Sequence, residues 1–146
     1  MTSIFVIKED GSGKGYTFLL DSALAYFDSF TLQWPGEQFS ARGLHSVGQE
    51  LRGNEIDTEK DLVLYRLDRQ ALGALLRPGS LFGWKSPDYP ENPAFYRAHR
   101  TGFTVTSSPG FPCVACVLDH EFARLLSPRI HLSEEPVSDS FLRKVV

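Results

Sequence analysis

The sequence contains no long hydrophobic run, although 42% of its 146 residues are hydrophobic. The apolar stretches at residues 18–20 and 114–118 fall far short of the roughly 20 residues that a helix needs to cross a bilayer. The N-terminal stretch also lacks the basic segment and apolar core of a secretory signal. We therefore expect no membrane segment, no membrane partner and a cytoplasmic location.

Cysteine is scarce, and the two positions it occupies argue against thiol chemistry. Cys113 and Cys116 have the spacing of a redox pair or of half a metal site. Both lie in an apolar run that predicts a strand, in which side chains three positions apart point to opposite faces. We expect both cysteines to be packing residues in a reducing compartment.

Histidine is also sparse, and its spacing does not indicate a metal site. No HxH or HExxH pattern occurs, and Arg124 occupies the position after His120 at which a zinc helix needs a second histidine. The four histidines are His45, His99, His120 and His131. We expect neither a metal ion nor a cofactor.

No cluster of Lys and Arg is present, which disfavours nucleic acid as a partner. The charge is nevertheless uneven: residues 1–61 include ten acidic and five basic residues, whereas residues 62–100 include three acidic and six basic ones. An acidic first segment could complement a basic protein partner. The candidate acidic binding residues are Glu50, Glu55, Asp57, Glu59 and Asp61.

The glycine-rich segment 11–15 does not fit a phosphate-binding loop. The position that needs the first glycine holds Lys8, and Gly15 follows Lys14 where Ser or Thr is required. A hairpin that joins strands at residues 3–8 and 15–20 explains the glycines better. Asp21 then predicts the start of a short helix with Leu24 on its buried face.

The remaining pattern predicts an α+β fold. Capping aspartates precede two short helices, Asp68 before residues 69–76 and Asp119 before residues 121–126. We expect strands at residues 30–34, 62–67, 94–98, 102–107, 111–118 and 129–132, and loops at 55–61 and 86–93, while residues 39–51 could be strand or irregular. The expectation is a single domain over residues 1–146, mainly an antiparallel sheet with two or three short helices packed on it.

Three segments of the second half resemble the arginine, Ser-Thr-Ser and glutamate order of one class of ADP-ribosyltransferases. They are Arg66 on a predicted strand, Ser107 at the end of Thr-Val-Thr-Ser, and Glu134 or Glu135. The resemblance implies that the arginine helps to hold NAD, the serine shapes the nicotinamide pocket and a glutamate supports attack at the ribose. The central motif departs from Ser-Thr-Ser, and Pro136 follows the glutamates directly.

Aromatic residues surround the proline-rich segment 86–93 and mix with arginines as they do at protein interfaces. They either anchor the loop and the core or form a recognition surface; Trp84, Tyr89 and Tyr96 are the candidates. Without convergent catalytic residues, a binding protein is favoured over an enzyme. Our hypothesis is an inhibitory domain, similar in kind to a bacterial immunity protein, that neutralises a partner by stoichiometric binding; the alternative is the ADP-ribosyltransferase-like enzyme.

Overall fold

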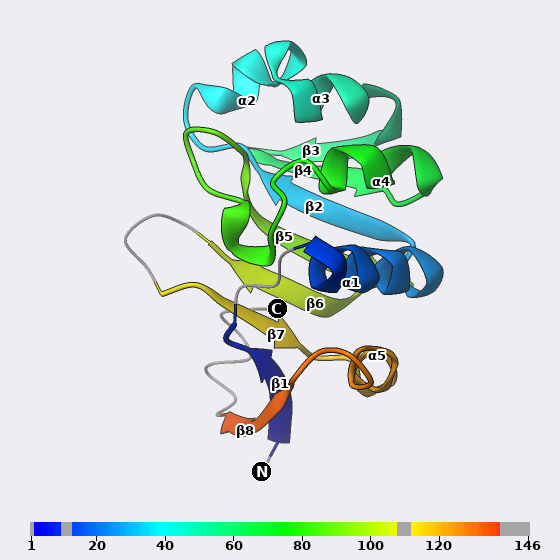
Figure 1. Ribbon diagram of the computed structural model, residues 1–146. Helices are drawn as coiled ribbons and strands as arrows, with labels where there is room; N and C mark the ends of the chain where they lie inside the picture. The colour runs from blue at the N-terminus through cyan, green and yellow to red at the C-terminus, as the bar shows by residue number, and fades with distance from the viewer. Residues whose placement is uncertain (1, 10–12, 108–111, 138–146) are drawn as a thin grey trace.

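One eight-stranded antiparallel sheet organises the protein (Figure 1). The computed structural model describes residues 2–9, 13–107 and 112–137, with no side-chain description for residues 2, 3 and 137. Its strand order is β3-β4-β2-β5-β6-β7-β1-β8. The strands are β1 (Thr2–Ile7), β2 (Ser29–Gln33), β3 (Glu55–Glu59), β4 (Leu62–Arg66), β5 (Glu91–Arg97), β6 (Arg100–Thr106), β7 (Val114–Val117) and β8 (Ser133–Val137).

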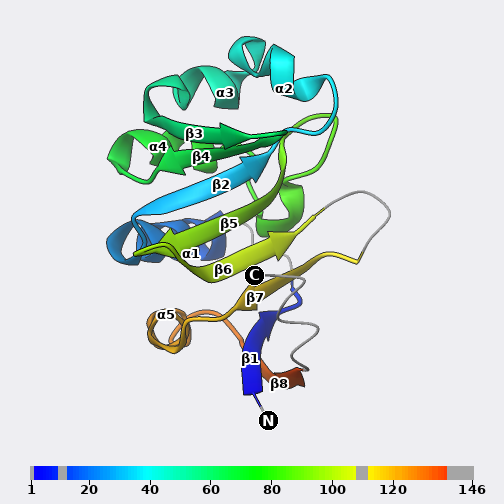
Figure 2. The same ribbon diagram turned by 180° about the vertical axis from the view of Figure 1, so that it is seen from behind.

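Helices cover one face of this sheet, while no helix of the described residues covers the opposite face (Figure 2). The α-helices are α1 (Gly13–Tyr26), α2 (Gln38–Ala41), α3 (Ser46–Glu50), α4 (Arg69–Leu75) and α5 (His120–Leu126). Three 3-10 turns supplement them: η1 (Arg42–Leu44), η2 (Arg52–Asn54) and η3 (Leu81–Gly83). We call the side that lacks helices the open face.

The main core lies between the helices and the sheet, and both tryptophans belong to it. Trp34 Nε1–H donates to the Tyr65 hydroxyl at 2.9 Å, and Trp84 Nε1–H donates to the Tyr16 hydroxyl at 2.9 Å. Tyr16 in turn donates to the Leu75 carbonyl at 2.6 Å, which ties α1 to α4. Each large aromatic group therefore enters the core with its polar atom satisfied.

The predicted α+β class and its antiparallel sheet are confirmed, with more helices than the two or three expected. The strands at β2, β4, β5, β6 and β7 occupy the expected segments, although residue 111 lies outside the described residues. Both caps also form: Asp68 accepts from Ala71 N–H, and Asp119 accepts from Glu121 N–H. Alternation of apolar and polar residues predicted these strands, and the capping aspartates predicted the starts of these helices.

The predicted hairpin at the N-terminus is wrong, because residues 15–20 lie in α1 rather than in a strand. The buried side chains of this helix are Tyr16, Leu19, Leu20 and Ala23. Their spacing of three, four and seven residues is that of one helical face. The helix begins at Gly13, whose φ of 56° suits glycine, and residues 10–12 lie outside the described residues.

Four other segments differ from expectation for local reasons. Residues 39–51 are largely helical. Residues 55–59 form strand β3 rather than a loop, because hydrogen-bonded pairing with β4 holds a polar segment as a strand at the end of the sheet. Residues 129–132 are not a strand, since Arg129 and Ile130 N–H donate to the Leu126 carbonyl and prolong the turn after α5. Strand β5 already begins at Glu91, and Pro93 is tolerated at an irregularity in its pairing with β2.

Candidate functional site

A row of acidic residues lies along strand β3. This strand is at one end of the sheet, so one of its edges has no strand neighbour among the described residues. We call this row the acidic edge. It consists of Glu55, Asp57 and Glu59 on β3 and of Asp61 in the turn to β4. Asp57 and Glu59 are exposed, while Glu55 and Asp61 are half-buried. Four of the five acidic residues predicted from the sequence are thus gathered on one strand and its turn.

The pairing with β4 fixes the direction of these side chains. Val63 is fully buried in the main core, so its neighbours Leu62 and Leu64 point to the open face. The register places Glu59 opposite Leu62 and Asp57 opposite Leu64, and opposed residues share a face. Asp57 and Glu59 therefore lie on the open face beside two leucine side chains.

Two large apolar side chains remain exposed at the acidic edge, and sequence reasoning did not select them. Ile56 is 56% exposed and Leu62 is 38% exposed. A sequence signal existed, because Ile56 interrupts the charged run from Glu55 to Asp61 near its start and Leu62 directly follows its end. Their combination with neighbouring carboxylates gives the edge both an apolar and an acidic character.

The acidic residues differ in the partners that they have inside the protein. Glu55 accepts from Arg42 at 3.1 Å, which anchors the start of β3 to η1, and Asp61 accepts from the Gln33 side chain at 3.2 Å. Asp57 accepts from Thr58 N–H at 2.9 Å. Among the described residues, neither Asp57 nor Glu59 forms an ion pair, so their charges face solvent.

Glu50, the remaining acidic candidate, lies apart from this row at the end of α3. Its carboxylate accepts from Arg77 Nε–H at 2.6 Å and forms an ion pair with the same guanidinium. This contact links α3 to the turn after α4. The pairing compensates its charge locally, so we do not include it in the acidic edge.

The three aromatic candidates are held by contacts within the protein. Trp84 is only 2% exposed, so its side chain belongs to the core and not to the surface. Tyr89 is half-buried and donates to the Arg77 carbonyl at 3.1 Å. The hydroxyl of Tyr96, on β5, lies 3.1 Å from Thr31 Oγ1 on β2. These side chains anchor the loop and the sheet and do not join the acidic edge.

The residues that carry the resemblance to ADP-ribosyltransferases are spread across the sheet. Arg66 lies on β4, whereas Glu134 and Glu135 lie on β8, six steps away in strand order. At about 4.8 Å per step, the two strands are on the order of 30 Å apart. Ser107 is fully buried and exchanges hydrogen bonds of 3.0 and 2.8 Å with Asn92. The implied NAD site is therefore not assembled.

The two cysteines pack in different clusters: Cys116 lies on β7, and Cys113 directly precedes that strand. Cys113 packs against the main core, whereas Cys116 belongs to a small cluster with Ile4 and Val6 on the other face. Burial raises the pKa of the Cys116 thiol, so it does not supply a reactive thiolate. Among the described residues, no group of His, Cys, Asp and Glu is arranged to hold a metal ion.

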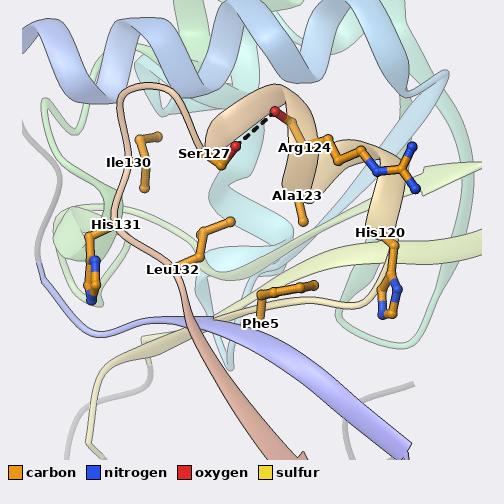
Figure 3. A pocket seen from close by; sticks show the side chains of 8 residues that line it. All are labelled: Phe5, His120, Ala123, Arg124, Ser127, Ile130, His131 and Leu132. Atoms are coloured by element: carbon orange, nitrogen blue, oxygen red, sulfur yellow. Dashed lines mark hydrogen bonds between the residues drawn. The ribbon is translucent and has the colours of Figure 1, made fainter.

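A hollow of about 450 Å³ lies at the other end of the sheet, between β1, α5 and the segment that follows α5 (Figure 3). It is lined by Phe5, His120, Ala123, Arg124, Ser127, Ile130, His131 and Leu132. Sequence reasoning missed it because its residues come from distant segments. One signal was available, since His120, Arg124 and Ser127 recur at the four- and seven-residue spacing of one helical face.

Comparison of the chain with protein-family models, with curated proteins and with solved structures finds no match. Among the described residues, no helix is long and apolar enough to cross a membrane.

Proposed function

We propose that this protein is a small binding domain that neutralises a basic protein partner by stoichiometric association at the acidic edge. The observation that carries the proposal is a terminal strand with exposed Asp57 and Glu59 beside exposed Ile56 and Leu62. A bacterial immunity protein is an example of such an inhibitor. Its action needs a complementary surface and no catalytic residues.

Charge and backbone both favour association at this strand. Carboxylates without internal ion pairs attract a basic surface, accelerate encounter and disfavour acidic partners. The outer backbone groups of a terminal strand can also accept a strand from another chain. A partner with an extended basic segment would therefore meet matching charges and hydrogen-bonding groups together.

The apolar side chains at the edge supply the short-range part of the interaction. Burial of Ile56 and Leu62 in a partner removes apolar surface from water, which typically contributes more to affinity than exposed charge pairs do. The carboxylates then select a basic partner and orient it. The unpaired thiols of Cys113 and Cys116 support a reducing compartment, so we place this association in the cytoplasm.

Charged side chains on a sheet edge can serve to bind a partner or to prevent aggregation of the edge. A charge-reversal experiment distinguishes these two roles. The test variant combines Asp57→Lys with Glu59→Lys, which keeps the edge charged and so still guards it against aggregation. The control combines Asp21→Lys with Glu37→Lys, two exposed acids outside the acidic edge, and changes the net charge equally. Each protein is used as bait in a native lysate, and retained proteins are identified by mass spectrometry.

The proposal predicts that the wild type and the control retain the same basic protein in a one-to-one ratio, that the test variant loses it and that high salt releases it. Circular dichroism checks that all three baits are folded. Equal retention by the test variant and the control, or a retained partner that is acidic, would reject the proposal.

A further inference from the structure

The hollow beside α5 combines an apolar floor with a basic rim. Figure 3 shows Phe5 and Leu132 between His131 on one side and His120 on the other. Ile130 and Ala123 complete the apolar part of the lining. At about 450 Å³ the hollow is within the usual size of small-molecule sites, which span roughly 300 to 1,000 Å³.

The polar part of the lining carries only groups that can favour an anion. Arg124 and the two histidines contribute guanidinium and imidazole N–H donors, and no Asp or Glu lines the hollow. The Phe5 ring meets the His120 ring edge-on, with 5.3 Å between their centroids, and so holds the imidazole at the rim. Ser127, the residue directly after α5, donates its hydroxyl to the Arg124 carbonyl at 3.2 Å.

Two carboxylates lie near the hollow, but neither of them lines it. Glu121 pairs with Arg124 at 3.0 Å, and the two side chains are 63% and 76% exposed. An ion pair so open to solvent is weak, so a ligand can compete for the guanidinium. Glu134 is the strand partner of Phe5 on β8 and does not line the hollow.

We propose that this hollow binds a small organic anion, a carboxylate attached to an aliphatic or aromatic body. The body rests on Phe5, Ile130 and Leu132, and the carboxylate meets Arg124 at the rim together with His120, which lies on the same side of the hollow (Figure 3). Guanidinium and carboxylate can form paired, charge-assisted hydrogen bonds, which gives the site its preference for an anion. A cation with an apolar body of the same size fits the apolar part of the hollow, but the Arg124 guanidinium repels its charge.

This site is separate from the acidic edge. Strand β1, which contributes Phe5, stands six steps from β3 in the sheet, which corresponds to roughly 30 Å. Substitution at one site therefore leaves the residues of the other untouched. Failure of the anion site would leave the proposed protein binding intact, and the reverse also holds.

Three probes of equal chain length test the proposal on the whole chain: octanoate, octylammonium and 1-octanol. Binding is followed by heteronuclear NMR titration, which reports both affinity and location. We expect octanoate to bind at least about tenfold more tightly than octylammonium, with the largest shifts at Phe5, Ala123 and Leu132. Arg124→Gln should weaken octanoate about tenfold and leave 1-octanol unchanged, whereas the exposed control Arg52→Gln should change neither.

A second variant guards against a purely structural effect at Arg124. His120→Gln removes the exposed imidazole on the Arg124 side of the rim, and we expect it to weaken octanoate and to leave 1-octanol unchanged. Equal affinity for the three probes, shifts located away from the hollow, or full octanoate affinity in both Arg124→Gln and His120→Gln would overturn the proposal.

Discussion

The buried Trp34 and Tyr65 side chains form a matched polar pair, and they show the consequence of burying such groups together. Both are fully buried, and the indole N–H has the Tyr65 hydroxyl as its acceptor. Burial raises the pKa of Tyr65 to about 12, an effect that the hydrogen bond from Trp34 opposes and the nearby Glu55 carboxylate reinforces. The folded state therefore favours the protonated phenol.

This shift predicts a loss of stability at alkaline pH. In the unfolded chain Tyr65 ionises near pH 10, whereas in the folded protein it stays protonated up to about pH 12. Its contribution is complete below pH 10 and disappears as the pH rises from 10 to 12; it amounts to about 3 kcal/mol. Urea unfolding between pH 8 and pH 12 measures it, since Tyr65→Phe should remove this part of the pH dependence.

The same variant has a cost at neutral pH, which provides an internal check. Tyr65→Phe leaves the Trp34 N–H buried without an acceptor, so the free energy of unfolding should fall by about 1–3 kcal/mol. Absorbance at 295 nm follows ionisation of the five tyrosines in the folded protein. If all five titrate near pH 10 while the protein remains folded, the account of the Tyr65 environment is wrong.

At the scale of secondary structure, a close approach between strand β6 and helix α1 depends on Gly102. A Cβ at this position would lie 2.9 Å from Phe27 Cζ and 3.2 Å from the Asp119 Cβ. Phe27 is buried directly after α1, and Asp119 caps α5, so neither group can yield freely. The missing side chain thus allows two helices to meet the same strand.

We predict that Gly102→Ala lowers the free energy of unfolding by about 1–3 kcal/mol through overpacking. Gly53→Ala is the matched control, since a Cβ there meets nothing within 4 Å and should change stability by less than about 0.5 kcal/mol. Chemical denaturation of both variants gives the comparison. Equal stability of the two would show that β6 and α1 are not held as closely as described.

Sequence information was sufficient for elements with strong local signals. Asp68 illustrates this: burial opposes its ionisation, but hydrogen bonds from Asn54, from the Ala71 N–H and from Arg66 outweigh it and lower the pKa. These hydrogen bonds are the cap that an aspartate before a helical segment predicts, so the start of α4 could be predicted from the sequence. Helix α1 was missed because its glycine-rich start suggested a turn and obscured the helical spacing of its buried residues.

The candidate site was only partly predictable for a related reason. The acidic run was visible in sequence, but its exposure depends on β3 being the terminal strand, which strand order alone decides. The separation of Arg66 from Glu134 and Glu135 is likewise a property of topology. The hollow beside α5 depends on a contact between β1 and residues more than one hundred positions later in the chain. No local pattern encodes such contacts.

At the scale of the whole molecule, the two proposed sites lie towards opposite ends of the sheet. One end presents the acidic edge with its exposed Ile56 and Leu62, and the hollow with Arg124 and His120 at its rim lies near the other. A basic protein would be attracted to one end and a small organic anion to the other, so simultaneous binding is expected without competition.

Hydrogen exchange of the protein alone and with its captured basic partner tests the central claim most directly. Residues 55–62 form the terminal strand, its turn and the first position of β4, and we predict that partner binding slows exchange of their amides while amides of α5 and β8 keep their rates. The test variant with Asp57→Lys and Glu59→Lys should show no such protection. Unchanged exchange at residues 55–62 in a complex that is demonstrably formed, or protection confined to another surface, would contradict the account.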